Sequence, residues 1–264
     1  MIPEGLTWLA GAPKIGKSFF VLGMGWAISR GGRAFGQVPV EQGEVLYLAL
    51  EDGPKRVKKR LLAMGYDTMP SGDPFHIVTE WRRMGDGGLK QLAYWLESHP
   101  KCRLVVIDTL AKIRPNDLKP TNLYQADYDV GDALHDVANQ FRIALVVTNH
   151  NRKMKADDWL EQMSGTFGLA GAADGAMAMF RDSGKKEALL CVTGRDIEEE
   201  SKLALRWDDK IVNWCLTGDY EQARMSAERK SIVKILTESD QALHYKDVAG
   251  IMRRQNPDVN VASV

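Results

Sequence analysis

The residues with the clearest chemical potential run from Gly11 to Ser18 and read GAPKIGKS. They match the pattern G-x-x-x-x-G-K-[ST], in which the backbone N–H groups of a glycine-rich turn surround a phosphate. The lysine neutralises phosphate charge, and the final hydroxyl can ligate a magnesium ion. An apolar run precedes the loop and a helical pattern follows it, so a helix N-terminus adds its dipole. The segment predicts a site for the phosphates of ATP and for Mg²⁺.

The expected contacts with the nucleotide extend one residue beyond this loop. They comprise Gly11, Ala12, Pro13, Lys14, Ile15, Gly16, Lys17, Ser18 and Phe19. Asp108 ends the apolar run Leu104–Ile107, as in a Walker B motif, and is expected to hold magnesium with Ser18, with Thr109 beside it as a brace. The alternative is that Asp108 only caps the segment after it.

Two further carboxylates, Glu51 and Asp52, follow the apolar run Val45–Leu50. A general base for ATP hydrolysis must lie one water molecule away from the γ-phosphorus, and a strand end beside the phosphate loop provides that position. Glu51 is the preferred base. Asp52 is the second choice, and a solvated turn carboxylate is the third interpretation.

Strands alternate with helices between residue 5 and about residue 194, which predicts an α/β fold with a mostly parallel sheet. The predicted strands are Gly5–Ala10, Glu44–Leu50, Arg103–Asp108, Arg142–Thr148, Gly175–Phe180 and Glu187–Thr193, followed by a hairpin of Lys202–Arg206 and Lys210–Leu216. The predicted helices are Lys17–Arg30, Pro54–Met64, Gly88–Ser98, Asn122–Gln140, Glu221–Glu238 and Lys246–Arg254. We expect an ATPase domain over residues 1–217 and a small helical appendage over residues 218–264.

Composition narrows the class of protein. The chain has 264 residues, of which 44% are apolar, so it can bury a proper core. The 35 basic and 35 acidic residues cancel, and any nucleic-acid surface must therefore be local. Three widely spaced cysteines (Cys102, Cys191 and Cys215) suit buried thiols in a reducing compartment, and no metal-motif spacing is present. No apolar run is long enough for a membrane span, so we expect a cytoplasmic protein.

The order of these motifs resembles the RecA-like hexameric helicase ATPases, particularly plasmid RepA-type helicases and phage or mobile-element primase–helicases. The similarity extends from Gly5 to about Trp214. Its pieces are GAPKIGKS, VLYLALED, LVVIDTLAKIRP, VVTNHNRK, SGTFGLAGAAD and VTGRD. The resemblance implies a RecA-like fold, a catalytic Glu51 and a γ-phosphate sensor at His150.

The same resemblance implies a basic residue that reaches the nucleotide of a neighbouring subunit. Arg195 occupies that place in TGRD. Thr193 stands where some relatives carry a lysine, so Arg206 remains an alternative, as does an ordinary surface ion pair.

Two long connections, Ala111–Thr121 and Asn151–Gly168, would face the central channel of such a ring. They carry the six basic residues expected to contact single-stranded DNA, namely Lys112, Arg114, Lys119, Arg152, Lys153 and Lys155. Solvated loop charges without a ligand are the alternative. The leading hypothesis is an ATP-driven ring helicase in replication. The second is a non-translocating RecA-like ATPase that acts as a regulatory or recombination-mediator switch, and a small-molecule kinase is the third.

Overall fold

A computed structural model of the chain describes residues 2–66, 72–115, 123–150, 159, 173–195, 197–239 and 241–255. The chain divides into two compact units, Met1–Leu216 and Thr217–Val264. In the second unit, α8 (Tyr220–Thr237) and α9 (Tyr245–Gln255) pack through Ile235, Val248 and Met252. Within the described part of the chain, no helix combines the length and the apolar character that a membrane crossing requires.

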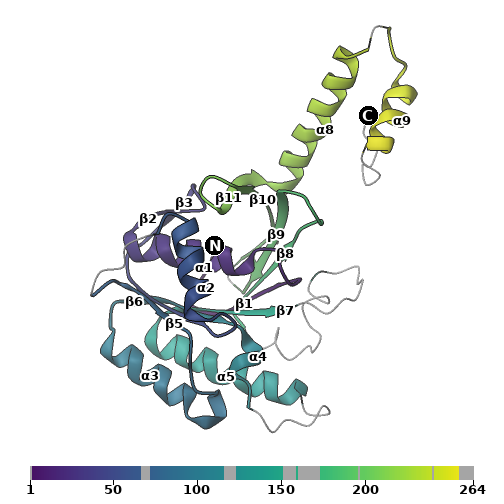
Figure 1. Ribbon diagram of the computed structural model, residues 1–264. Helices are drawn as coiled ribbons and strands as arrows, with labels where there is room; N and C mark the ends of the chain where they lie inside the picture. The colour runs from purple at the N-terminus through teal and green to yellow at the C-terminus, as the bar shows by residue number, and fades with distance from the viewer. Residues whose placement is uncertain are drawn as a thin grey trace. The chain divides into compact units, whose positions relative to one another are not determined.

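A nine-stranded sheet forms the centre of the described fold (Figure 1). In spatial order its strands are β11 (Asn213–Asp219), β10 (Ser201–Asp208), β9 (Glu187–Gly194), β8 (Gly175–Phe180), β1 (Gly5–Gly11), β7 (Ala144–His150), β6 (Cys102–Asp108), β4 (Glu44–Ala49) and β5 (Phe75–Val78). The strands from β8 to β5 run parallel, whereas β9 is antiparallel to β8 and β10 is antiparallel to β9. The predicted α/β class with a mostly parallel sheet is confirmed.

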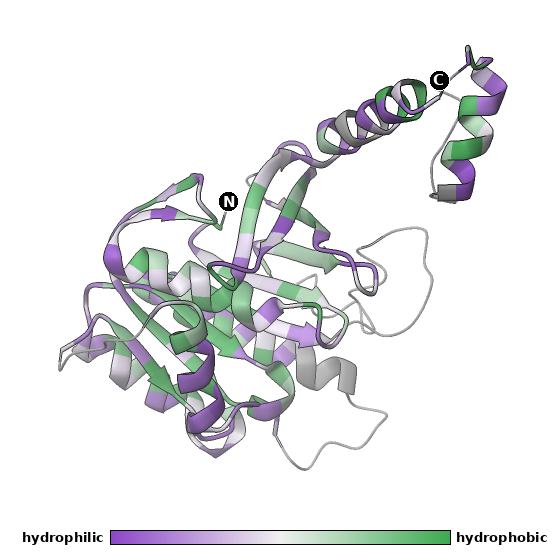
Figure 2. Cartoon of the chain, turned by 45° about the horizontal axis from the view of Figure 1, so that its top comes forward, coloured by the Kyte–Doolittle hydropathy of each residue, from purple (hydrophilic) through white to green (hydrophobic). Residues whose placement is uncertain are grey.

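Helices cover both faces of this sheet, and each face has its own apolar core (Figures 1 and 2). On one face lie α1 (Lys17–Arg30), α2 (Pro54–Ala63) and the hairpin of β2 (Gly32–Ala34) and β3 (Val38–Val40). On the other lie α3 (Gly88–Ser98), the short α4 (Leu110–Ile113) and α5 (Leu123–Phe141), with a 3₁₀ turn at Met84–Asp86. In α5 the apolar side chains of Val130, Leu134 and Val137 are buried in the core of this face.

The long predicted elements are present, with ends that differ by a few residues. β5 and the β2–β3 hairpin were not predicted, because strands of three or four residues are too short to show a clear alternation of apolar and polar residues. Cys102 and Cys191 are buried as expected, whereas Cys215 is only half-buried, and all three are free thiols.

Candidate active site

The phosphate loop leaves the sheet at Gly11 and enters α1 at Lys17. Gly16 has a φ of 107°, in the left-handed region that glycine adopts without strain. A β-carbon at Gly16 would also lie 2.7 Å from the indole Nε1 of Trp214 on β11. That indole donates a hydrogen bond of 3.1 Å to the carbonyl of Gly16. Trp214, which was not among the predicted site residues, therefore holds the turn that opens the helix.

Lys17 is the buried cation of the site, with 7% of its surface exposed. Its Nζ donates hydrogen bonds to the carbonyl oxygens of Gly11 at 2.7 Å and Ala12 at 3.1 Å. Burial lowers the pKa of Lys17 from 10.5 to about 8, while the carboxylates of Asp108 and Glu51 act in the opposite direction. Both carboxylates thus lie within electrostatic reach of the ammonium group, and the fold brings these three predicted residues together.

Asp108 is 5% exposed at the carboxyl end of β6. Its Oδ2 accepts a hydrogen bond from the Tyr47 hydroxyl at 2.8 Å, and its Oδ1 accepts one from the Thr148 hydroxyl at 2.6 Å. Burial and the nearby Asp108 raise the pKa of Tyr47 well above its ordinary value, so the phenol remains a donor. The hydroxyl of Thr109 instead donates to the Thr148 carbonyl at 2.7 Å. Tyr47 and Thr148 therefore supply the brace that was expected at Thr109.

Glu51 and Asp52 follow β4 but have different surroundings. Asp52 is 6% exposed, and its carboxylate forms ion pairs with Arg56 at 3.1 Å and with Arg60. Glu51 is exposed, and its charge acts on Lys17. Asp52 is therefore bound to α2, whereas water can reach the carboxylate of Glu51.

A row of aromatic rings runs from the phosphate loop to the late strands. Phe19 meets Trp207 edge to face with ring centroids 5.2 Å apart, and Trp207 meets Trp214 in the same way at 5.4 Å. The guanidinium of Arg60 lies 5.4 Å from the centre of the Phe19 ring.

Of the other predicted loop residues, Ala12, Pro13 and Lys14 are exposed, Gly11 and Ile15 are buried, and Ser18 is half-buried.

The carboxyl ends of the parallel strands form one edge of the sheet, and their amino ends form the opposite edge. The two candidate arginines lie at these two different edges. The backbone N–H of Arg195 donates to the carbonyl of Asp174 at 2.9 Å, and its side chain, 58% exposed, lies 3.4 Å from the Asp174 carboxylate. Asp174 also accepts a hydrogen bond of 2.9 Å from the N–H of Leu6, near the start of β1. The phosphate loop leaves the other end of β1. Counted along β1 at about 3.3 Å per residue, it lies roughly 15–20 Å from Asp174. Arg206 of β10 lies opposite Glu187 in the strand register with β9, and this register places it on the phosphate-loop side of the sheet.

The remaining predicted residues are only partly described. His150 ends β7, where its backbone pairs with Gly11 in β1, but its side chain lies outside the described residues. Lys112 is exposed in α4, and Arg114 follows it half-buried, with its carbonyl accepting a hydrogen bond of 2.6 Å from Arg83. Four of the predicted DNA contacts fall outside the described residues, namely Lys119, Arg152, Lys153 and Lys155.

Solved structures that share this fold over most of the chain include two ATPases. One is an ATPase domain that aligns with a TM-score of 0.62 and 14% identity, covering 81% of this chain and 85% of that chain. The other is a DnaB-like replicative helicase, studied with its interactions with primase, which aligns with a TM-score of 0.64 and 16% identity. That alignment covers 81% of this chain and 59% of the helicase. At these identities the similarity shows the fold, which is RecA-like as predicted.

The sequence itself matches a family over the phosphate loop, both acidic strand ends and β7. No curated protein matches the sequence. The family match covers residues 1–156, more than half of the chain, and its description is AAA domain. A P-loop ATPase domain of this kind implies nucleotide binding, typically with Mg²⁺. The chain therefore belongs to the AAA domain family.

Proposed function

We propose that this protein is an ATP-driven helicase that assembles into a hexameric ring and moves along single-stranded DNA during replication of a plasmid, phage or mobile element. The observation that carries the proposal is the division of its charged groups between two sheet edges. Lys17, Asp108 and Glu51 lie at one edge, and Arg195 lies at the other. Arg195 can reach a nucleotide only in a second copy of the chain, so hydrolysis becomes coupled to assembly.

The phosphate-loop edge has the features that a magnesium nucleotide requires. A buried ammonium group, a helix N-terminus and a glycine turn lie together at Lys17 and Gly16. Ser18 and the firmly held Asp108 are the proposed magnesium ligands, and the ion would neutralise charge on the β- and γ-phosphates. The ion pairs of Asp52 favour Glu51 as the group that takes the proton of the attacking water.

Glu51→Gln is expected to retain ATP binding and to lower turnover by at least about 100-fold, because an amide cannot accept the proton. Asp52→Asn is the matched control: it removes the neighbouring charge and its ion pairs, so it lowers the melting temperature but leaves most of the turnover. Lys17→Ala should lose both binding and turnover. Steady-state ATPase rates and fluorescent-nucleotide binding measure these effects. The reverse ranking of Glu51→Gln and Asp52→Asn would assign the base to Asp52.

Arg195→Ala is expected to lower turnover by about 10³-fold or more, because an arginine supplied in trans stabilises transition-state charge. Mixing Arg195→Ala with Lys17→Ala subunits should restore activity, since an intact loop then meets an intact arginine at some interfaces. Arg206→Ala is the matched control and should keep most of the turnover. The absence of recovery at every mixing ratio, with mixed oligomers shown by mass, would rule out Arg195 as the trans arginine.

The helicase assignment also depends on DNA contact by the basic loops and on the sensor role proposed for His150. Lys112, exposed beside the end of β6, supports such contact, because α4 follows Asp108 after one residue. A change at the γ-phosphate could therefore be passed over a short distance, from Asp108 at the end of β6 to Lys112 in α4.

Strand displacement on a forked duplex tests the whole proposal. Single-stranded DNA is expected to stimulate ATP hydrolysis, and the protein with ATP and Mg²⁺ should release the labelled strand. Lys17→Ala should do neither. Stimulation without displacement would contradict the helicase assignment and favour a non-translocating RecA-like ATPase that acts as a regulatory or recombination-mediator switch.

A further inference from the structure

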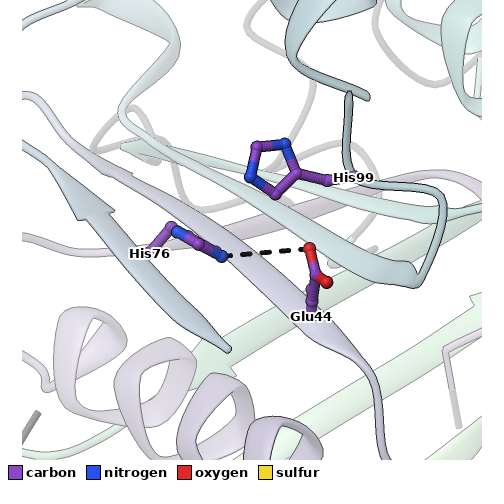
Figure 3. Close-up of side chains that lie close together, drawn as sticks. All are labelled: Glu44, His76 and His99. Atoms are coloured by element: carbon purple, nitrogen blue, oxygen red, sulfur yellow. Dashed lines mark ion pairs between the residues drawn. The ribbon is translucent and has the colours of Figure 1, made fainter. Parts of the chain in front are cut away.

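Three side chains that can ligate a metal meet at the edge of the sheet opposite the phosphate loop (Figure 3). Glu44 is the first residue of β4, His76 lies at the start of β5, and His99 directly follows α3. One ligand atom from each lies within 4.8 Å of the other two. Glu51, at the other end of β4, is roughly 20 Å away at 3.3 Å per residue, so the cluster is separate from the nucleotide site.

One oxygen of the Glu44 carboxylate lacks the partner that a buried polar atom needs. Its Oε2 is inaccessible to solvent and accepts no hydrogen bond from the described residues. The nearest basic group is Nε2 of His76 at 3.9 Å, too far for a hydrogen bond (Figure 3). A buried oxygen left in this way is costly, and a cation between the three side chains would remove the cost.

His99 is already oriented as a metal ligand. Its Nδ1 lies 2.8 Å from the carbonyl oxygen of Trp95, so a proton on Nδ1 makes that hydrogen bond and leaves the lone pair on Nε2. Its ring also stacks on the Trp95 indole, with centroids 3.8 Å apart. A carbonyl that fixes the second nitrogen is the usual outer contact of a metal-bound histidine.

We propose that Glu44, His76 and His99 bind a divalent transition-metal ion of the zinc class. Two imidazole nitrogens and one carboxylate oxygen are an established ligand set for Zn²⁺. Tetrahedral bonds of about 2.0–2.2 Å place ligand atoms about 3.4 Å apart, so the cluster needs to contract by at most about 1.5 Å. The ion would join the sheet-edge strand β5 to β4 and to the end of α3.

Water would supply the fourth ligand of this ion. A surface pocket lined by Glu44 and its cross-strand neighbour Cys102 gives solvent access. The thiol of Cys102 donates to the Leu104 carbonyl over 3.6 Å. Its sulfur is not among the ligand atoms that meet in the cluster, so Cys102 is not one of the proposed ligands.

Zinc titration of the tag-free, chelator-treated chain, in the absence of nucleotide, tests this proposal. Calorimetry is expected to show one Zn²⁺ per chain, and saturating Zn²⁺ should raise the melting temperature. Glu44→Gln and His99→Gln should each weaken binding at least about tenfold. His135→Gln is the matched control, because this half-buried histidine lies beside Asp174, outside the cluster, and should leave zinc affinity unchanged.

Either of two results would overturn the proposal. One is a wild-type chain that shows no saturable Zn²⁺ binding. The other is a doubly substituted Glu44→Gln, His99→Gln chain that binds Zn²⁺ as tightly as the wild type, with its fold checked by circular dichroism. The wild-type titration needs no variant, so the proposal remains open to disproof even if substitution at this edge prevents folding.

Discussion

The burial of one ammonium group is the constraint on which the site depends. Lys17 loses most of its hydration, which lowers its pKa to about 8, and the loop carbonyls and the charges of Asp108 and Glu51 partly offset this loss. Such a group is costly unless an anion approaches it, and a triphosphate is the anion that the helix N-terminus and glycine turn fit. Parallel strands satisfy the constraint, because their carboxyl ends bring β1, β4 and β6 to one edge.

The sheet also keeps different functions apart. The carboxyl edge holds the groups that we propose to face phosphate, and the opposite edge holds Arg195 with Asp174 as well as the proposed metal site. A ring in which Arg195 enters the site of the next copy would place these two edges face to face. The proposed ion would stiffen β5, which has a sheet partner only in β4 among the described strands.

Local sequence predicted most of the architecture and part of the site. The phosphate loop and Asp108 are recognisable because their spacing is set by a single turn or a single strand end. Tyr47, Thr148 and Trp214 were missed, because each contacts the site through pairing of strands distant in sequence. The Glu44 cluster was missed for the same reason: its members come from β4, β5 and the end of α3, and no short spacing links them.

The affinity for a non-hydrolysable ATP analogue, measured with Mg²⁺ from pH 7 to pH 10, tests the central claim about Lys17 most directly. Phosphate raises the pKa of the bound ammonium, so below pH 8, where Lys17 is already protonated, affinity should vary little. Above pH 8 the free protein must take up a proton on binding. The affinity for the analogue should therefore decrease with rising pH, by up to about tenfold for each pH unit. A constant affinity between pH 8 and pH 10, with the protein still folded, would contradict the account.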